Sequence, residues 1–347
     1  MEFRQTILTV ALCTFAAIAA DFNFSFVGKY SDKFSKDPEK ALFDGELKYN
    51  ASHVIWEAGA APKGCGVILT FQKPTAISKV VVVTSKPNSI AYTPSHTDFQ
   101  AWDSEKQEWK EPTVVNDVTG RFDDKTFITA KPIITEWQAN ENTEGIRILM
   151  FGHAIWLTEI EIYDANGTKL APEPMPAAAE DPLLLPLCAQ GGGPSVNLNY
   201  YNEKQPYVGN PNPLGRKDRS MLLFDIRECL DKGAVSSASL NLGMAPMGII
   251  TTNMFAMEVF GNSRSSLRSQ DLIASDAKLH RQFLFSAQSV QTMRIDVTEL
   301  VNNVLKQGDG YIGFRFKDIT IEKVGNRQNK AEGLLFQYQK CKLEIVK

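Results

Sequence analysis

The stretch Trp156-Leu157-Thr158-Glu159-Ile160-Glu161-Ile162-Tyr163 closes a β-rich region that opens far earlier in the chain with Leu42-Phe43-Asp44-Gly45 and then Trp56. Between these segments lie short runs of β-branched and aromatic residues, separated by Pro, Gly, Asn and Asp. Many short strands without regular helical patterns indicate an antiparallel sandwich rather than a parallel α/β sheet. The predicted strands are residues 67–71, 80–84, 98–102, 146–150 and 160–163.

The opening Asp-Gly turn and the closing strand together resemble the discoidin-like sandwiches, also described as coagulation-factor type C or galactose-binding-like domains. The resemblance covers residues 21–170, and many domains of this family are carbohydrate-binding modules. It implies a β-sandwich with a glycan ligand and without catalysis.

The resemblance also implies a structural Ca²⁺ ion, held by Asp44, Glu159 and backbone carbonyls of the loop that turns at Gly45. A hard cation prefers such oxygen ligands. The loop contains few acidic residues, because Glu46 is the only other carboxylate close to Asp44 in the sequence. The alternative is that Asp44 makes an Asx-turn before glycine and that Glu159 is a solvated strand residue.

Sugar binding needs a flat aromatic face together with planar hydrogen-bonding groups. The two leading candidates, Tyr92 and His96, flank Pro94 in the predicted loop before residue 98. The arginine of the family's galactose-binding members is missing from that loop, which argues against galactose itself. The alternative for each candidate is an ordinary surface or core role, and a core role is expected for Trp56 and Trp156. The full candidate set is Tyr92, His96, Arg121, Trp137 and His153.

A second series of predicted strands covers residues 220–226, 238–242, 257–260, 311–316 and 342–346. One helix is predicted between Asp296, which can cap it, and Gly308, with Glu299 completing a capping box. This region resembles DNRLRE-type carbohydrate-binding sandwiches, which recur in secreted bacterial polysaccharide-degrading proteins. Residues 337–341 depart from that family's pattern.

The composition changes between residues 171 and 186, where five prolines and four alanines stand close together. Proline repeats favour an extended, semi-rigid conformation, so this segment is predicted to be a linker. The predicted fold is all-β, with two antiparallel, jelly-roll-like β-sandwich domains joined by this Pro/Ala-rich linker and one short helix in the second. The predicted domains are residues 21–170 and 187–347.

Residues 1–20 have the pattern of a signal peptide, with Arg4 ahead of an apolar stretch and a small-x-small site at residues 17–19. No later segment reaches the ~18 apolar residues of a membrane-spanning helix. We therefore expect a secreted protein, extracellular or periplasmic, and the alternative is an uncleaved anchor. The formal net charge of -3 provides no basic field for nucleic acid.

Four cysteines lie beyond the signal peptide, and their irregular spacing does not match a zinc site. In an oxidising compartment one alternative is a disulfide among Cys188, Cys229 and Cys341. The other is a free core cysteine, because Cys341 precedes a strand with apolar residues on one face.

The chain has four histidines but no H-E-x-x-H motif, no G-x-S-x-G elbow and no P-loop. Paired carboxylates far apart in the chain are left open. The sequence predicts a secreted, non-catalytic carbohydrate-binding protein that recognises an extracellular polysaccharide or glycan. The alternatives are a structural or adhesive envelope protein, and a polysaccharide lyase or glycoside hydrolase or an accessory protein of one. The sequence names no protein partner.

Overall fold

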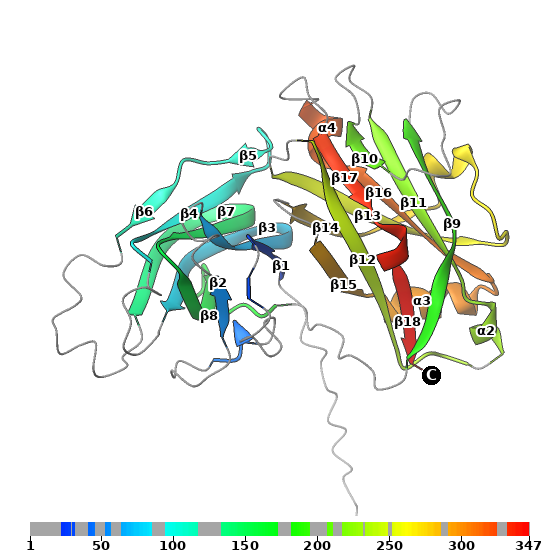
Figure 1. Ribbon diagram of the computed structural model, residues 1–347, viewed down its shortest axis with the longest axis horizontal. Helices are drawn as coiled ribbons and strands as arrows, with labels where there is room; N and C mark the ends of the chain where they lie inside the picture. The colour runs from blue at the N-terminus through cyan, green and yellow to red at the C-terminus, as the bar shows by residue number, and fades with distance from the viewer. Residues whose placement is uncertain are drawn as a thin grey trace, which may run out of the picture.

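The computed structural model describes residues 22–28, 30–31, 41–45, 53–56, 64–84, 94–116, 133–172, 182–194, 207–210, 217–231, 233–248, 252–285, 291–324 and 332–346. The predicted signal peptide and the candidates Tyr92 and Arg121 lie outside these residues. Two antiparallel sheets of eight and ten strands lie next to each other, and no strand pairing joins them within the described residues (Figure 1). The prediction of an all-β chain with two sandwiches is confirmed.

The first sheet lies within residues 22–164. Its strands are β1 Phe22–Val27, β2 Val54–Trp56, β3 Cys65–Thr84, β4 His96–Asp103, β5 Glu108–Trp109, β6 Thr113–Val115, β7 Ile133–Phe151 and β8 Ile155–Asp164.

The long strands β3 and β7 serve both layers of the first sandwich. The first part of β3 lies between β1 and β7, whereas its last part lies between β7 and β8. The ladder with β7 is interrupted between Thr70 and Thr75. The separate predicted strands 67–71 and 80–84 are therefore parts of one strand, because β3 continues through Pro74. Since Pro74 lies in the interruption, its missing N–H removes no ladder hydrogen bond.

The second sheet lies within residues 183–346. Its strands are β9 Leu183–Pro194, β10 Tyr207–Asn210, β11 Asp218–Asp225, β12 Ser237–Gly248, β13 Asn253–Asn262, β14 Lys278–Phe285, β15 Gln291–Asp296, β16 Tyr311–Asp318, β17 Glu332–Phe336 and β18 Lys342–Val346. Its helical segments are α2 Arg227–Leu230, η5 Ser269–Leu272, α3 Thr298–Lys306, α4 Ile319–Val324 and η6 Tyr338–Lys340.

The predicted helix after Asp296 is α3, but the predicted capping box does not form, because Val297 occupies the N-cap position and makes no side-chain cap hydrogen bond. The Oδ1 atom of Asp296 accepts hydrogen bonds from the N–H of Thr298 at 2.8 Å and from its hydroxyl at 2.6 Å. The inward residues Val301 and Val304 are buried. The prediction of a single helix is wrong, because the short helices α2 and α4 also form.

The connection between the two sheets is shorter than predicted. The second sheet begins at Leu183, where β9 pairs with β18, and Pro172 already forms an isolated bridge with Phe22. The prolines of this segment suggested a linker, but Pro186 lies where the pairing of β9 passes from β18 to β11. A proline is tolerated at such a change of partner, and the preceding leucines supply the apolar surface that a strand buries.

The strand β14 forms one edge of the second sheet, and its unpaired side faces the first sheet (Figure 1). The N–H of Gln282 donates to a side-chain amide at 3.1 Å, and the N–H of Leu284 donates to a threonine hydroxyl at 2.9 Å. Their carbonyl oxygens accept hydrogen bonds from further side chains. Side chains of β1 and β3 thus occupy the position of a neighbouring strand. The side chains are those of Asn23, Ser25, Thr70 and Gln72.

Apolar residues seal the same junction. Val27, Ile68 and Trp102 of the first sheet pack with Met254 and Leu284 of the second, and all five are buried. The two sandwiches therefore share a small core in addition to their own.

The four described cysteines form no disulfide with one another. Cys229 and Cys341 are buried, as a core cysteine would be, whereas Cys188 is exposed. Burial raises the pKa of the Cys341 thiol to about 11. In the described parts no helix has the length and apolarity needed to cross a membrane.

Candidate functional site

An aromatic stack lies at the end of the first sheet where β4 begins and β7 ends. His96 of β4 lies opposite Phe151 of β7, with ring centroids 4.6 Å apart and planes within 5° of parallel. On the other side of Phe151 lies Gly64, where an added Cβ would come within 2.9 Å of the ring. The Phe151 ring is therefore held between a backbone and an imidazole.

The neighbouring Ser95 orients the imidazole. Its hydroxyl donates to the carbonyl oxygen of Phe151 at 2.9 Å and lies 3.1 Å from Nδ1 of His96. Because the hydroxyl hydrogen is already used, we assign the proton of His96 to Nδ1, which then donates to Ser95. The Nε2 atom is left as an acceptor for a ligand hydroxyl.

Two further histidines belong to the connection after β7 and to the residues just before β2. His153 is exposed on the short connection between β7 and β8. His53, just before β2, stacks on Trp156 of β8 at 4.1 Å. Phe151, His153 and Trp156 thus place two aromatic rings and an imidazole within one short stretch of chain.

The five sugar-contact candidates have different outcomes. His96 and His153 lie at the end of the sheet where β4 begins and β7 ends, and Tyr92 and Arg121 fall outside the described residues. Trp137 is not a loop residue, so its prediction as a contact is wrong. It lies in β7, is 7% exposed, and stacks on Phe99 in the core at 5.5 Å.

The two tryptophans expected in the core also differ. Trp56 is fully buried, as predicted. Trp156 is only half-buried, because it shares its place with His53 at the edge formed by β2 and β8.

Sequence reasoning missed a polar cluster on the same sheet face. Arg147 of β7 donates from Nε at 2.9 Å and from Nη2 at 2.5 Å to the side-chain oxygen of Gln100 on β4. The guanidinium also lies 4.8 Å from the ring centre of Trp109. Burial lowers the pKa of Arg147 to about 10, and the charge of Asp98 acts in the opposite direction. Only the cross-strand register places these residues together, which a single sequence does not reveal.

The residues expected to bind calcium lie near each other. Glu159 is 0% exposed, and its Oε2 accepts the N–H of Gly45 at 3.0 Å. Burial raises the pKa of Glu159 to about 7, against the effects of Lys169 and of that N–H, and the charge of exposed Asp44 adds to the rise. The alternative in which Glu159 is a solvated strand residue is therefore wrong.

A lysine already compensates the charge of Glu159. The ammonium of Lys169 lies 3.3 Å from Oε1 of Glu159 and 2.9 Å from Glu161. Among the described residues no three His, Cys, Asp or Glu side chains converge, so backbone carbonyls would supply the other ligands. The donors are all oxygens, which suits Ca²⁺, and Lys169 is the competing cation.

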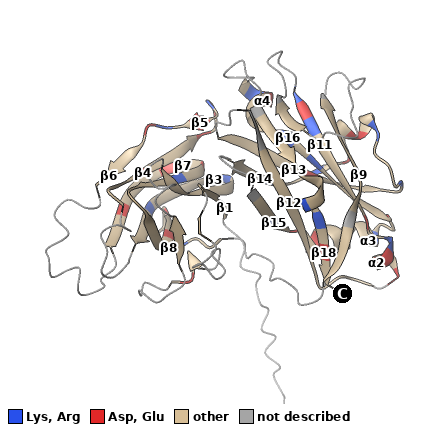
Figure 2. Cartoon of the chain, viewed as in Figure 1, with Lys and Arg blue, Asp and Glu red and all other residues tan. Residues whose placement is uncertain are grey.

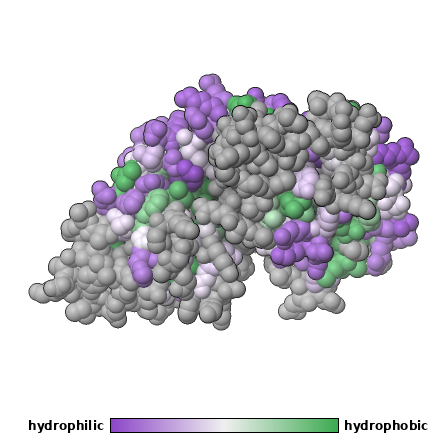
Figure 3. Space-filling model, turned by 45° about the horizontal axis from the view of Figure 1, so that its top comes forward, coloured by the Kyte–Doolittle hydropathy of each residue, from purple (hydrophilic) through white to green (hydrophobic). Residues whose placement is uncertain are grey.

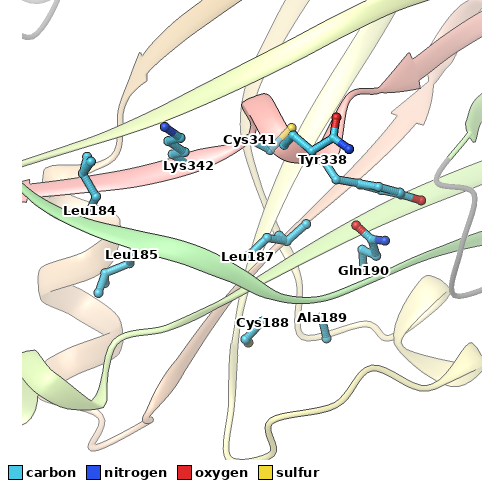
Figure 4. A pocket seen from close by; sticks show the side chains of 10 residues that line it. Leu184, Leu185, Leu187, Cys188, Ala189, Gln190, Tyr338, Cys341 and Lys342 are labelled. Atoms are coloured by element: carbon cyan, nitrogen blue, oxygen red, sulfur yellow. The ribbon is translucent and has the colours of Figure 1, made fainter.

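The second sandwich has a separate groove of about 480 Å³ between β9 and β18 (Figure 4). Leu184, Leu185 and Leu187 contribute to its mainly apolar lining, and Lys342 is its only charged residue. The side chains of this groove indicate a ligand class less specifically than those on the outward face of β4 and β7.

The surface shows no single dominant patch. Positive and negative residues are scattered over both sandwiches in the described parts (Figure 2). On the side shown in Figure 3, the described apolar residues lie in small groups among polar ones. Recognition through a broad basic stripe or a broad apolar patch is therefore not favoured on that side.

No protein-family model matches the chain. No curated protein matches it either.

Several solved structures are similar to the chain, with low TM-scores. An F5/8 type C domain from Bacteroides fragilis covers 42% of this chain and 97% of its own, with 16% identity and a TM-score of 0.30. Discoidin II of Dictyostelium discoideum covers 91% of this chain and 96% of its own, with 8% identity and a TM-score of 0.29. The paired CBM32 domains of Clostridium perfringens ZmpB, in complex with GalNAc, cover 94% and 90%, with 10% identity and a TM-score of 0.29.

These names belong to the discoidin-like class that residues 21–170 resemble. The DNRLRE-type resemblance of the second region stays a prediction. At these TM-scores, no ligand and no residue role is transferred to this chain.

Proposed function

We propose that this is a secreted, non-catalytic carbohydrate-binding protein that recognises an extracellular polysaccharide or glycan through the first sandwich. The observation that carries the proposal is the His96–Phe151 stack at the end of the sheet where β4 begins and β7 ends. The outer face of the His96 ring, which Phe151 supports from behind, can lie against the C–H face of a sugar, and its Nε2 atom can accept a hydroxyl hydrogen bond. Tyr92 and His153 are proposed as neighbouring contacts.

The other parts of the proposal come from the sequence. Residues 1–20 support secretion to the extracellular space or periplasm, and the absence of nucleophile, zinc and phosphate motifs supports a non-catalytic role. A structural Ca²⁺ ion at Asp44 and Glu159 belongs to the same proposal. It would support the loop at Gly45 and neutralise a buried carboxylate.

The test is a glycan array followed by calorimetric titration of the best ligands. We expect micromolar to millimolar affinity, about 4 to 8 kcal/mol of binding free energy, because a shallow site buries little area. Phe151→Ala, which removes the support of the His96 ring, and Tyr92→Ala, which removes an aromatic ring, should each weaken binding about three- to tenfold. Ile273→Ala is a matched control, because it removes an exposed apolar side chain of the second sandwich.

If the wild type binds no glycan, the structural or adhesive envelope role replaces this proposal. If Phe151→Ala and Tyr92→Ala bind as the wild type does, the site lies elsewhere on the molecule.

A further inference from the structure

We infer that the ligand is an uncharged oligosaccharide that lies along the face of β4 and β7, from the His96–Phe151 stack to the junction with the second sandwich. The inference rests on the proposed carbohydrate-binding function and names the ligand class and the length of its site.

The register places a continuous strip of side chains on one face. Phe99 of β4 and Ile148 and Met150 of β7 are fully buried, so the alternate residues of both strands point away from the core. The outward residues form three successive cross-strand rows that are half-buried or nearly buried. The rows are His96 with Phe151, Asp98 with Leu149, and Gln100 with Arg147.

The strip is longer than one sugar ring. Phe151 and Arg147 are four residues apart on β7, which corresponds to about 13 Å at the rise of a β-strand. On the neighbouring strand β3, the residue opposite Leu149 is Gly66, which has no side chain to project above the sheet there. A side chain at Gly66 would place its Cβ 2.0 Å from the carbonyl oxygen of Ile148.

The second sandwich closes the far end of the strip. Trp102, the next outward residue of β4, is buried in the shared core of the junction. On β7 the next outward residue is Gly145, and the position of its missing Cβ is taken by Leu284 of β14, 2.1 Å away. A ligand that starts at Phe151 therefore passes Leu149, which packs against the edge of the shared core, and reaches a wall just beyond Arg147.

The polar groups of the strip indicate an uncharged, hydroxyl-rich ligand. Within the described residues the Asp98 carboxylate accepts no hydrogen bond, and the Arg147 guanidinium uses Nε and Nη2 but not Nη1. Arg147 also has no carboxylate within ion-pair distance in the described parts. The Oδ1 atom of Asp98 is buried without a partner, so a sugar hydroxyl would donate to Oδ2 of Asp98, and another would accept from Nη1 of Arg147. A uronate would be repelled by Asp98 and an ammonium group by Arg147, whereas a neutral sugar suits both.

Arg147 is held ready for such a ligand. Gln100 receives two of its N–H groups, and Trp109 supports the guanidinium plane. A side chain that is already ordered loses less entropy on binding.

The experiment uses the full chain with gluco-, manno- and xylo-oligosaccharide ladders of increasing length and an oligogalacturonate ladder. We expect the affinity of the wild type for one neutral ladder to rise with chain length and then level off. Arg147→Met should lower the affinity for the longer members about tenfold and leave the monosaccharide unchanged. Asp98→Asn, which is nearly isosteric, should weaken neutral binding and reduce discrimination against galacturonates.

Arg227→Met is the matched control, because Arg227 also lies over an aromatic ring, that of Tyr311, but on the second sandwich. Melting temperatures verify that each variant is folded. If the wild type binds sugars without dependence on chain length, and Arg147→Met binds like it, the strip is wrong while the site at Phe151 stands. A preference for the galacturonates overturns the uncharged ligand, and no binding at all overturns the proposed function as well.

Discussion

At the scale of single residues, burial strongly affects the ionisation of Glu159. Burial raises its pKa to about 7 in the folded protein, whereas an unfolded glutamate titrates near ~4.3. The folded state therefore holds the proton more tightly. Its contribution to stability is complete below about pH 4.3 and is lost as the pH rises through about 7.

The variant Glu159→Gln should remove this dependence. Between pH 5 and pH 8, we expect the wild type to lose about 1 to 3 kcal/mol of unfolding free energy more than the variant does. Urea denaturation at both pH values measures the difference, with Glu105→Gln on the exposed turn as control. Equal pH dependence in Glu159→Gln and the wild type would contradict the assignment.

A calcium ion at Asp44 and Glu159 would change stability by linkage. At a hundredfold excess over Kd it should add about 2.7 kcal/mol, so chelator should lower the melting temperature. Asp44→Ala should abolish that sensitivity, whereas Lys169→Met should increase it by removing the competing ammonium. A wild type that melts identically with calcium and with chelator has no such site.

The residues of the site were predictable only where a single position carries the signal. His96, His153, Asp44 and Glu159 were chosen from the sequence; Asp44 and Glu159 lie near each other, and the binding roles of all four stay predictions. Phe151 was not chosen, because its role depends on the strand that lies opposite. Trp137 was chosen wrongly, since an isolated tryptophan gives no indication of which side of a strand it occupies.

At the scale of elements, β14 makes the junction specific. Leu284 is 1% exposed and packs in the shared core, although it belongs to the second sheet. We expect Leu284→Ala to lower the unfolding free energy by about 2 to 4 kcal/mol, as large-to-small core substitutions do. Leu279→Ala on the same strand, where the side chain is 54% exposed, should change it little. Equal effects of the two substitutions in urea unfolding would show that the junction contributes no packing energy.

Most strands were predictable because alternation and β-branched runs are local signals. The errors occur where tertiary pairing overrides a local signal. Pro74 suggested the end of a strand, but it lies where a ladder is interrupted. Pro186 suggested a linker, but it lies where a strand changes its pairing partner. The helix α3 was visible because its buried face repeats at helical spacing within a few residues, whereas α2 and α4 are too short to show a period.

At the scale of the whole molecule, the two sandwiches should stay together after the connection is cut. Limited proteolysis is predicted to cleave within the connection between residues 172 and 183 and to leave two folded fragments. Because hydrogen bonds and apolar packing join the sheets, we expect the fragments to co-elute in native gel filtration and to separate in denaturant. Separate elution under native conditions would show that the junction is too weak to hold them.

The manner in which β14 is covered has a consequence for the second sandwich expressed alone. Without Gln72 and Thr70, the main chain of Gln282 and Leu284 would lie open at the sheet margin. Open strand margins pair with one another between copies. We expect the solitary second sandwich to self-associate in light scattering, and a proline at Gln282 to suppress this by removing a donor. The first sandwich would then protect the second from polymerisation by covering its edge strand.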